Sequence, residues 1–242
     1  MLIIGHRGAS GHAPENTLAA FKKAVALGAS FIETDLQLSR DARFVAIHDD
    51  TLNRTTNGQG RVHDHTLGVL RQLDAGSWFG SEFTGERIPT LEEILEFAKK
   101  NDVVFYLELK PTGSWGGEHA LIGALRDSGE IARVVVISFD HAILASLRTI
   151  EPTLMTGVLY DGQISDPLRV AVEVGARQVA VRGDLVTPHL IDEAHEQDLQ
   201  VVCWTVNHPA HIRLLLAGGV DGIMSDYPER IIAAQKKDVA KG

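Results

Sequence analysis

Short apolar runs typical of β-strands alternate with amphipathic segments typical of α-helices along almost the whole chain. The strand-type runs lie at residues 2–5, 30–35, 103–109, 133–137, 154–159, 178–181, 200–204 and 220–224. The helix-type segments, in which apolar residues recur every three or four positions, lie at residues 16–27, 91–100, 118–128, 141–150, 167–174, 188–197, 209–217 and 228–237. Because a strand followed by a helix returns to a parallel neighbour, eight such units favour a closed parallel sheet. The predicted fold class is therefore α/β, a (β/α)8 TIM barrel.

Residues that typically begin helices precede several of the helix-type segments. They are Asn16, Thr90, Asp140, Thr187 before a proline, and His208 before a proline. A side chain at this position accepts a hydrogen bond from a backbone N–H that the first helical turn leaves free. We therefore expect these residues to mark helix starts. For Asn16 and its neighbour Glu15, the alternative is that they orient Arg7.

Two segments interrupt the alternation. Residues 31–49 predict an overlong strand, a tight turn at Asp41-Ala42 and an antiparallel return strand, which would place His48 opposite Glu33 or Asp35. Residues 51–89 are polar and rich in glycine, and they are too long for a simple connection. We interpret them as a small insertion over one end of the barrel, within a single domain that spans residues 1–242.

The composition excludes several classes of protein. Hydrophobic residues make up 44% of the chain, enough for a full core, yet no run of them reaches the roughly 18–20 residues of a membrane span. The formal net charge of −9 disfavours general binding of nucleic acid, so an anionic substrate needs a locally cationic site. The one cysteine, Cys203, excludes an internal disulfide and a cysteine-based zinc cluster. A single cysteine also fits a reducing compartment. Because residues 1–20 show no signal-peptide pattern, we expect the protein in the cytoplasm.

Ionisable residues gather where the predicted strands end, which is the working face of a (β/α) barrel. Glu33 and Asp35 stand two apart and so share one face of a strand, and Glu108 lies at the end of the next parallel strand in the chain. Carboxylates packed together repel one another unless a cation lies among them, and oxygen ligands suit Mg²⁺ or Ca²⁺. The three residues are candidate metal ligands. The alternative is that they are solvated or paired with arginine and lysine.

Two histidines and two cations belong to the same set of strand ends. His6 and His48 are candidates for acid–base catalysis, because each ends a predicted strand beside carboxylates and histidine exchanges protons near neutral pH. Arg7 and Lys110 are candidate phosphate-binding residues, with ion pairs to carboxylates as the alternative. Trp204 is either an apolar wall for a glycerol backbone or a core residue. Together these residues suggest cleavage of a phosphate diester, which needs one proton removed and another delivered.

A set of short motifs resembles the glycerophosphodiester phosphodiesterase family in both order and spacing. The motifs are His6-Arg7-Gly8, Pro14-Glu15-Asn16-Thr17, Glu33-Thr34-Asp35, His48-Asp49 followed by Thr51-Leu52-Asn53-Arg54-Thr55-Thr56, Asp74-Ala75-Gly76-Ser77-Trp78, Glu108-Leu109-Lys110, Thr205-Val206-Asn207 and Gly219-Val220-Asp221-Gly222-Ile223. They span nearly the whole chain, and none of the motif positions is substituted. The complete set is therefore specific, although each motif alone is weak evidence.

The resemblance implies a barrel of the phospholipase-C-like phosphodiesterase type, with the insertion after the second strand. It implies an enzyme that hydrolyses a small-molecule glycerophosphodiester to sn-glycerol 3-phosphate and an alcohol. The attacking oxygen is either water or the glycerol 2-hydroxyl. The alternatives are a related phosphodiesterase that acts on lysophospholipids or other diesters, and a non-catalytic barrel.

The same resemblance implies roles for individual residues. His6 and His48 match the catalytic acid–base pair of the family, and Arg7 and Lys110 match its phosphate-contacting positions. The implied cofactor is a divalent metal, Mg²⁺ or Ca²⁺. Its ligands would be Glu33, Asp35 and Glu108.

Overall fold

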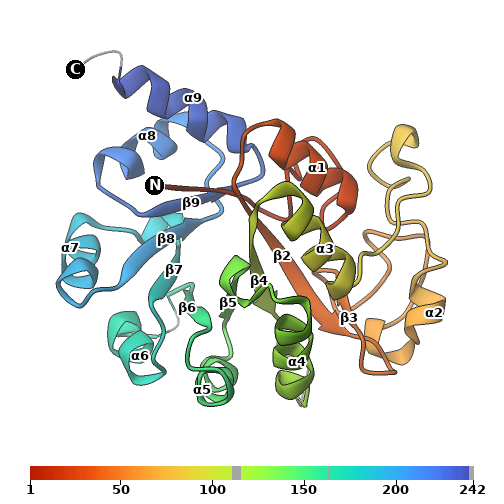
Figure 1. The fold of residues 1–242 in the computed structure, drawn as a ribbon. Helices are drawn as coiled ribbons and strands as arrows, with labels where there is room; N and C mark the ends of the chain where they lie inside the picture. Colours follow the sequence, from red (N-terminus) through yellow and green to blue (C-terminus); the bar gives the residue numbers. More distant parts are fainter. Residues whose placement is uncertain (111–115, 163, 240–242) are drawn as a thin grey trace.

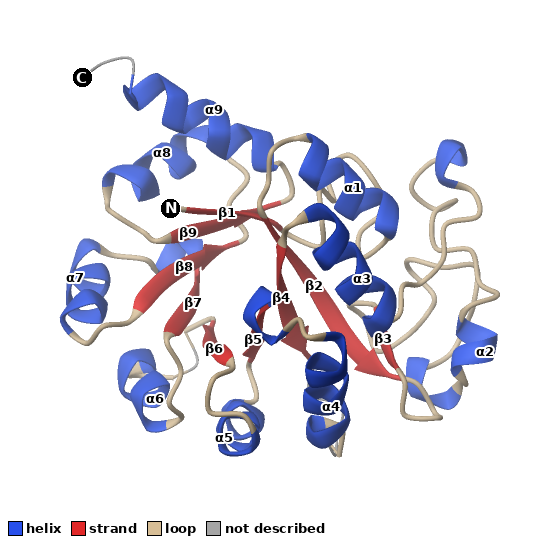
Figure 2. Cartoon of the chain, viewed as in Figure 1, coloured by secondary structure: helices blue, strands red, loops and turns tan. Residues whose placement is uncertain are grey.

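Nine strands form one sheet in the portion of the chain that the structure, a computed structural model, describes: residues 1–110, 116–162 and 164–239. Parallel pairing of the first two strands closes this sheet into a barrel (Figure 2). Around the barrel the order is β1 (Leu2–Gly5), β2 (Phe31–Leu38), β4 (Val104–Leu109), β5 (Val134–Ser138), β6 (Met155–Tyr160), β7 (Gln178–Arg182), β8 (Gln200–Trp204) and β9 (Gly222–Ser225). The predicted (β/α)8 TIM barrel is confirmed.

Helices connect the parallel strands and surround them (Figure 1). They are α1 (Leu18–Ala26), α3 (Leu91–Asn101), α4 (Glu118–Ser128), α5 (His141–Ile150), α6 (Pro167–Glu173), α7 (Pro188–Glu196), α8 (Pro209–Ala217) and α9 (Pro228–Val239). Within the described ranges, no helix has both the length and the apolar character that a bilayer crossing requires.

The helix starts follow the predicted caps with one exception. The side chains of Thr90, Asp140, Thr187 and His208 accept hydrogen bonds from the first turns of α3, α5, α7 and α8. The prediction for α1 is wrong by one residue, because Thr17 rather than Asn16 is its N-cap. The reason is that the Asn16 side chain bonds to β2 instead, where the Thr34 hydroxyl donates to its Oδ1 over 2.7 Å.

Apolar residues form one layer inside the barrel and another between the strands and the helices. Side chains on a strand alternate between the two sides. The inner layer includes Ile4 and Tyr106. In the outer layer, the ring of Phe21 in α1 meets the rings of Phe97 and Phe105 edge to face, with centroids 6.0 and 5.2 Å away. Burial on both sides explains why the strands read as continuous apolar runs.

Strand β3 (Phe44–Ala46) pairs antiparallel with the far end of β2. The register pairs Leu36 with Ala46, and the Ile47 N–H donates to the Asp35 carbonyl over 3.0 Å. Ile47 therefore takes the place opposite Asp35, and the expected position of His48 opposite Glu33 or Asp35 is wrong by one residue. The reason lies in the turn, where the Ser39 N–H donates to the Arg43 carbonyl, so residues 40–42 form the loop and the register shifts by one position.

Residues 51–89 lie beyond β3, at the right of Figure 1. They contain η1 (Val62–Asp64), α2 (Leu67–Leu70) and η2 (Ser81–Phe83). Apolar residues of this segment pack on β3 in a small separate core, made of Val45, Ile47, Leu52, Val62, Leu70, Ala75 and Ile88. This packing supports the proposal that residues 51–89 are an insertion built on β3 within a single domain of residues 1–242.

Replacement of Phe21 by alanine should lower the free energy of unfolding by about 3–5 kcal/mol, because it leaves a cavity between α1, α3 and β4. Equilibrium denaturation in urea measures this change. The control is Leu214→Ala in α8, where the side chain is 69% exposed and the expected change is within about 0.5 kcal/mol. Equal stability of the two variants would contradict the packing described for the outer layer.

Candidate active site

A cavity of about 250 Å³ opens among the carboxyl ends of the strands. Seven of the eight predicted site residues line it, namely His6, Arg7, Glu33, His48, Glu108, Lys110 and Trp204. The eighth, Asp35, lies behind the cavity wall, in contact with the side chains of Arg7 and Lys110. The barrel therefore brings together residues that lie as far apart in the chain as positions 6 and 204.

Three buried carboxylates stand at the ends of β2 and β4. In the described portion of the chain, Glu33, Asp35 and Glu108 form a group whose ligand atoms all lie within 4.8 Å of one another. Burial and the charge of Asp35 raise the pKa of Glu108 to about 7. The pKa of Glu33 is also well above its usual value, because of burial and of repulsion by the other two carboxylates. Two of the three groups thus resist ionisation unless positive charge is supplied.

The donor set fits a hard divalent cation. All three side chains offer carboxylate oxygens, which are the ligands that Mg²⁺ and Ca²⁺ prefer. The Oε1 atom of Glu33 is buried and has no hydrogen-bond partner among the described residues. A buried, unpaired carboxylate oxygen is costly unless a cation or a proton satisfies it. These residues would hold the metal that the family resemblance implies.

Two permanent cations contact the same carboxylates. Lys110 Nζ lies 2.8 Å from Asp35 Oδ1 and also contacts Glu108 Oε1. Arg7 Nε lies 3.3 Å from Asp35 Oδ2, and the Arg7 backbone N–H donates to Glu33 Oε2 over 2.8 Å. Although burial opposes ionisation, Lys110 and Arg7 hold the pKa of Asp35 below its usual range. The ion pairs considered as the alternative are therefore present, and both cations still face the cavity.

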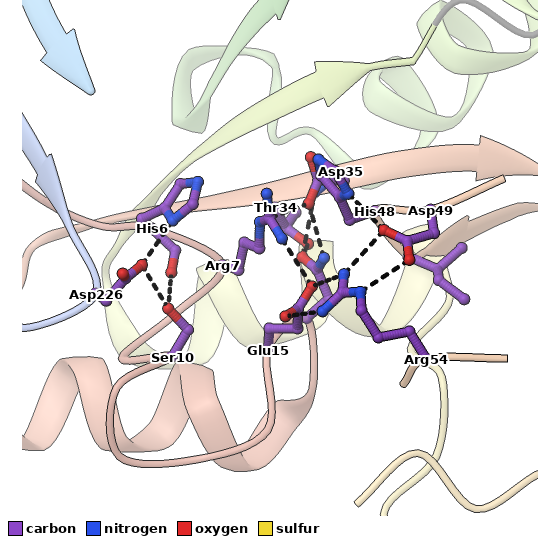
Figure 3. A network of polar contacts seen from close by, with 12 residues as sticks. His6, Arg7, Ser10, Glu15, Thr34, Asp35, His48, Asp49, Arg54 and Asp226 are labelled. Atoms are coloured by element: carbon purple, nitrogen blue, oxygen red, sulfur yellow. Dashed lines mark hydrogen bonds and ion pairs between the residues drawn. The ribbon is translucent and has the colours of Figure 1, made fainter. Parts of the chain in front are cut away.

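The His6 imidazole contacts the carboxylate of Asp226, a residue to which the sequence motifs give no role. Its Nδ1 lies 2.7 Å from Asp226 Oδ1 (Figure 3). The Ser10 hydroxyl donates to the same oxygen, and the Asn207 amide donates to Oδ2 of Asp226. Despite burial, these contacts lower the pKa of Asp226 to about 2. An ionised Asp226 favours a proton on Nδ1 of His6, which leaves Nε2 to exchange a proton in the cavity.

His48 is held in the same way by its neighbour in the chain. Its Nδ1 lies 2.7 Å from Asp49 Oδ1 (Figure 3). The Gln37 amide donates to the backbone carbonyls of both residues and fixes the turn after β3. Burial lowers the pKa of the His48 imidazole, and the nearby positive charges of Arg7 and Lys110 lower it further against the opposing effect of Asp35. A neutral His48 at neutral pH can accept a proton.

Trp204 lies in the cavity wall at the end of β8. Its indole N–H donates to the Ala180 carbonyl over 2.8 Å, and its ring meets Phe139 edge to face at 5.7 Å. These contacts fix the indole as a section of the cavity wall. Together with Ile137, Leu159 and Met224, the two rings make one side of the cavity apolar, opposite the ionisable residues.

Comparisons with known proteins agree over nearly the whole chain. The model of the glycerophosphoryl diester phosphodiesterase family matches residues 6–230. The chain is 39% identical over 238 residues to a protein of Caldanaerobacter subterraneus subsp. tengcongensis named glycerophosphodiester phosphodiesterase, and the match covers 98% of each chain. A protein of the same name from Bacillus altitudinis is 34% identical over 240 residues, which are 97% of this chain and 98% of that protein.

Solved structures are similar as well. A phosphodiesterase of Oleispira antarctica, in complex with the product sn-glycerol-3-phosphate, has a TM-score of 0.89 and 31% identity, covering 98% of this chain and 97% of that one. The glycerophosphodiester phosphodiesterase of Agrobacterium tumefaciens has a TM-score of 0.85 and 30% identity, covering 96% of this chain and 99% of that one.

Replacement of Glu108 by glutamine should change how stability depends on pH in chelator-treated protein. At pH values between the usual pKa of 4.5 and the folded value of about 7, the folded protein holds a proton that the unfolded chain releases. The free energy of unfolding should therefore fall as the pH rises through this range, by about 1–3 kcal/mol from this group. Urea denaturation at several pH values should show a smaller fall for Glu108→Gln. An unchanged slope would contradict the raised pKa. The control is Glu173→Gln, whose side chain is exposed on α6.

Proposed function

Because the chain belongs to the glycerophosphoryl diester phosphodiesterase family and is a glycerophosphodiester phosphodiesterase, we propose that it uses histidine acid–base catalysis and a divalent metal. The products are sn-glycerol 3-phosphate and an alcohol. The observation that supports the proposal most strongly is that two histidines, each held by a carboxylate, meet three buried carboxylates and two cations in one cavity.

Arg7 and Lys110 bind the phosphodiester. A diester carries one negative charge, and in a chain with a net charge of −9 it needs a local source of positive charge. Both cations are anchored to carboxylates and face the cavity. Anchored cations need no reorganisation as charge gathers on the phosphoryl oxygens, so they stabilise the transition state.

Glu33, Asp35 and Glu108 would hold the cation. The chemistry that a divalent ion would supply there is Lewis-acid stabilisation of negative charge on the phosphate. Asn16 keeps Asp35 in place, because its amide donates to Asp35 Oδ2 over 2.8 Å. Such outer contacts orient ligating carboxylates.

His6 and His48 move the protons. One imidazole takes the proton of the attacking oxygen, which belongs to water or to the glycerol 2-hydroxyl, and the other protonates the leaving alkoxide. The Nδ1 atoms face Asp226 and Asp49, so Nε2 is the atom of each ring that exchanges the proton. The carboxylates also stabilise the imidazolium that forms after proton uptake.

The apolar side of the cavity receives the carbon skeleton of the substrate. The rings of Trp204 and Phe139 form this side, and their surface suits the CH groups of a glycerol backbone. The complex of the Oleispira antarctica relative with sn-glycerol-3-phosphate supports the same substrate half for this chain.

His6→Ala and His48→Ala should each lower kcat by about 10²–10⁴-fold, the usual size of general acid–base catalysis. The assay follows release of sn-glycerol 3-phosphate from glycerophosphocholine with a coupled dehydrogenase. His189→Ala, whose side chain is exposed on α7, is the matched control and should keep the kcat of the unsubstituted protein. If both His6→Ala and His48→Ala stay folded and keep near-normal kcat, the histidine mechanism is wrong.

A further inference from the structure

Arg54, in the segment after β3, bonds to two carboxylates at once (Figure 3). On one edge of the guanidinium, Nε and Nη2 donate to the two oxygens of Asp49 over 2.8 and 2.9 Å. On the other edge, Nη1 and Nη2 donate to the two oxygens of Glu15 over 2.7 and 2.8 Å. Each contact is bidentate, which is the geometry that a planar guanidinium provides and an ammonium does not.

Each of these carboxylates also contacts a residue of the proposed mechanism. Asp49 Oδ1 lies 2.7 Å from Nδ1 of His48. Glu15 Oε1 accepts from Nη1 of Arg7 over 2.8 Å. Arg54 therefore connects a proton-transfer residue on the β3 side with a phosphate-binding residue on the β1 side through one side chain.

Positively charged side chains stabilise the ionised form of both carboxylates in this network. The bonds from Arg54, together with His48, lower the pKa of Asp49 below its usual range despite partial burial. Burial raises the pKa of Glu15, but Arg54 and Arg7 outweigh it and lower the pKa overall. Both carboxylates are thus ionised near neutral pH and can accept from His48 and Arg7.

We propose that Arg54 is a positioning residue of the reaction, which holds Asp49 and Glu15 so that His48 and Arg7 converge on the phosphate. The inference rests on the roles that the proposed function gives to His48 and Arg7. Arg54 is not among the residues that line the cavity, and its side chain is 43% exposed, so it acts through the two carboxylates.

Arg71, which follows α2, also links the insertion to the barrel, but it does so away from the cavity. Its Nη1 donates to the Ile88 carbonyl and its Nη2 to Glu93 in α3, both over 2.6 Å. Arg71 is therefore a matched control. It is an arginine of the same segment with a carboxylate partner, but it is not among the residues that line the cavity.

The experiment measures kcat and KM of Arg54→Gln, Arg54→Lys, Arg71→Gln and His48→Ala with glycerophosphocholine and glycerophosphoethanolamine. Arg54→Gln should lower kcat by about 10–100-fold with both substrates, the usual cost of losing an outer-shell partner. Arg54→Lys keeps the charge but cannot bridge two carboxylates in bidentate fashion, so it should recover little of this loss. Arg71→Gln should keep kcat within about twofold, because its hydrogen bonds go to Ile88 and Glu93, which do not line the cavity.

A double-mutant cycle distinguishes a positioning role of Arg54 from a merely structural one. The loss in Asp49→Asn combined with Arg54→Gln should be smaller than the product of the single losses, because both changes act through His48. Arg71→Gln combined with Arg54→Gln should give the product of the two single effects. Circular dichroism confirms the fold of each variant, and Arg54→Lys replaces Arg54→Gln in the cycle if the latter does not fold.

Three results would overturn the inference. They are a near-normal kcat for Arg54→Gln, an equal loss in Arg71→Gln, and a loss that appears in KM and depends on the head group, which would mean that Arg54 contacts substrate. His48→Ala distinguishes failure of the proposed function from failure of the positioning role. If His48→Ala keeps its activity, the proposed function fails; if it loses activity while Arg54→Gln does not, only the positioning role fails.

Discussion

The barrel buries three carboxylates together, and their negative charge has to be compensated. The rest of the site depends on this constraint. Parallel pairing of β2 with β4 places the ends of these strands side by side, so Glu33, Asp35 and Glu108 share one small volume. Their mutual repulsion in a buried setting has to be offset by positive charge. Arg7 and Lys110 supply some of it, and the raised pKa values of the two glutamates indicate that the compensation is incomplete. A divalent cation would complete it.

Charge pairing extends outward from this centre in a second layer. His6 rests on Asp226, and His48 rests on Asp49, so each proposed proton carrier has an ionised partner on the side away from the cavity. These partners are themselves fixed, Asp226 by serine and asparagine side chains and Asp49 by Arg54. The layer orients the imidazole rings before substrate arrives, which lowers the cost of reaching the transition state.

The periodic pattern of the fold could be predicted from sequence because buried parallel strands and amphipathic helices leave distinct apolar patterns. Residues at strand ends could be assigned to one site because the barrel gathers its strand ends at one face. The roles of Asp226 and Arg54 could not be predicted from the sequence. Their contacts join His6 to Asp226, 220 positions away, and Arg54 to Glu15, 39 positions away, and such contacts depend on tertiary packing. Asn16 matches the local pattern of an N-cap, but its amide bonds to β2, a partner that no local rule anticipates.

The most direct test of the charge-compensated, metal-dependent site is a metal titration of activity. Chelator-treated protein is incubated with glycerophosphocholine, without metal and with increasing Mg²⁺ or Ca²⁺, and release of sn-glycerol 3-phosphate is followed. We expect little release without metal and saturable restoration by at least one of the two ions, because three ionised carboxylates would then bind the cation. Full activity of the chelated protein without added metal would contradict the assignment of Glu33, Asp35 and Glu108 as metal ligands.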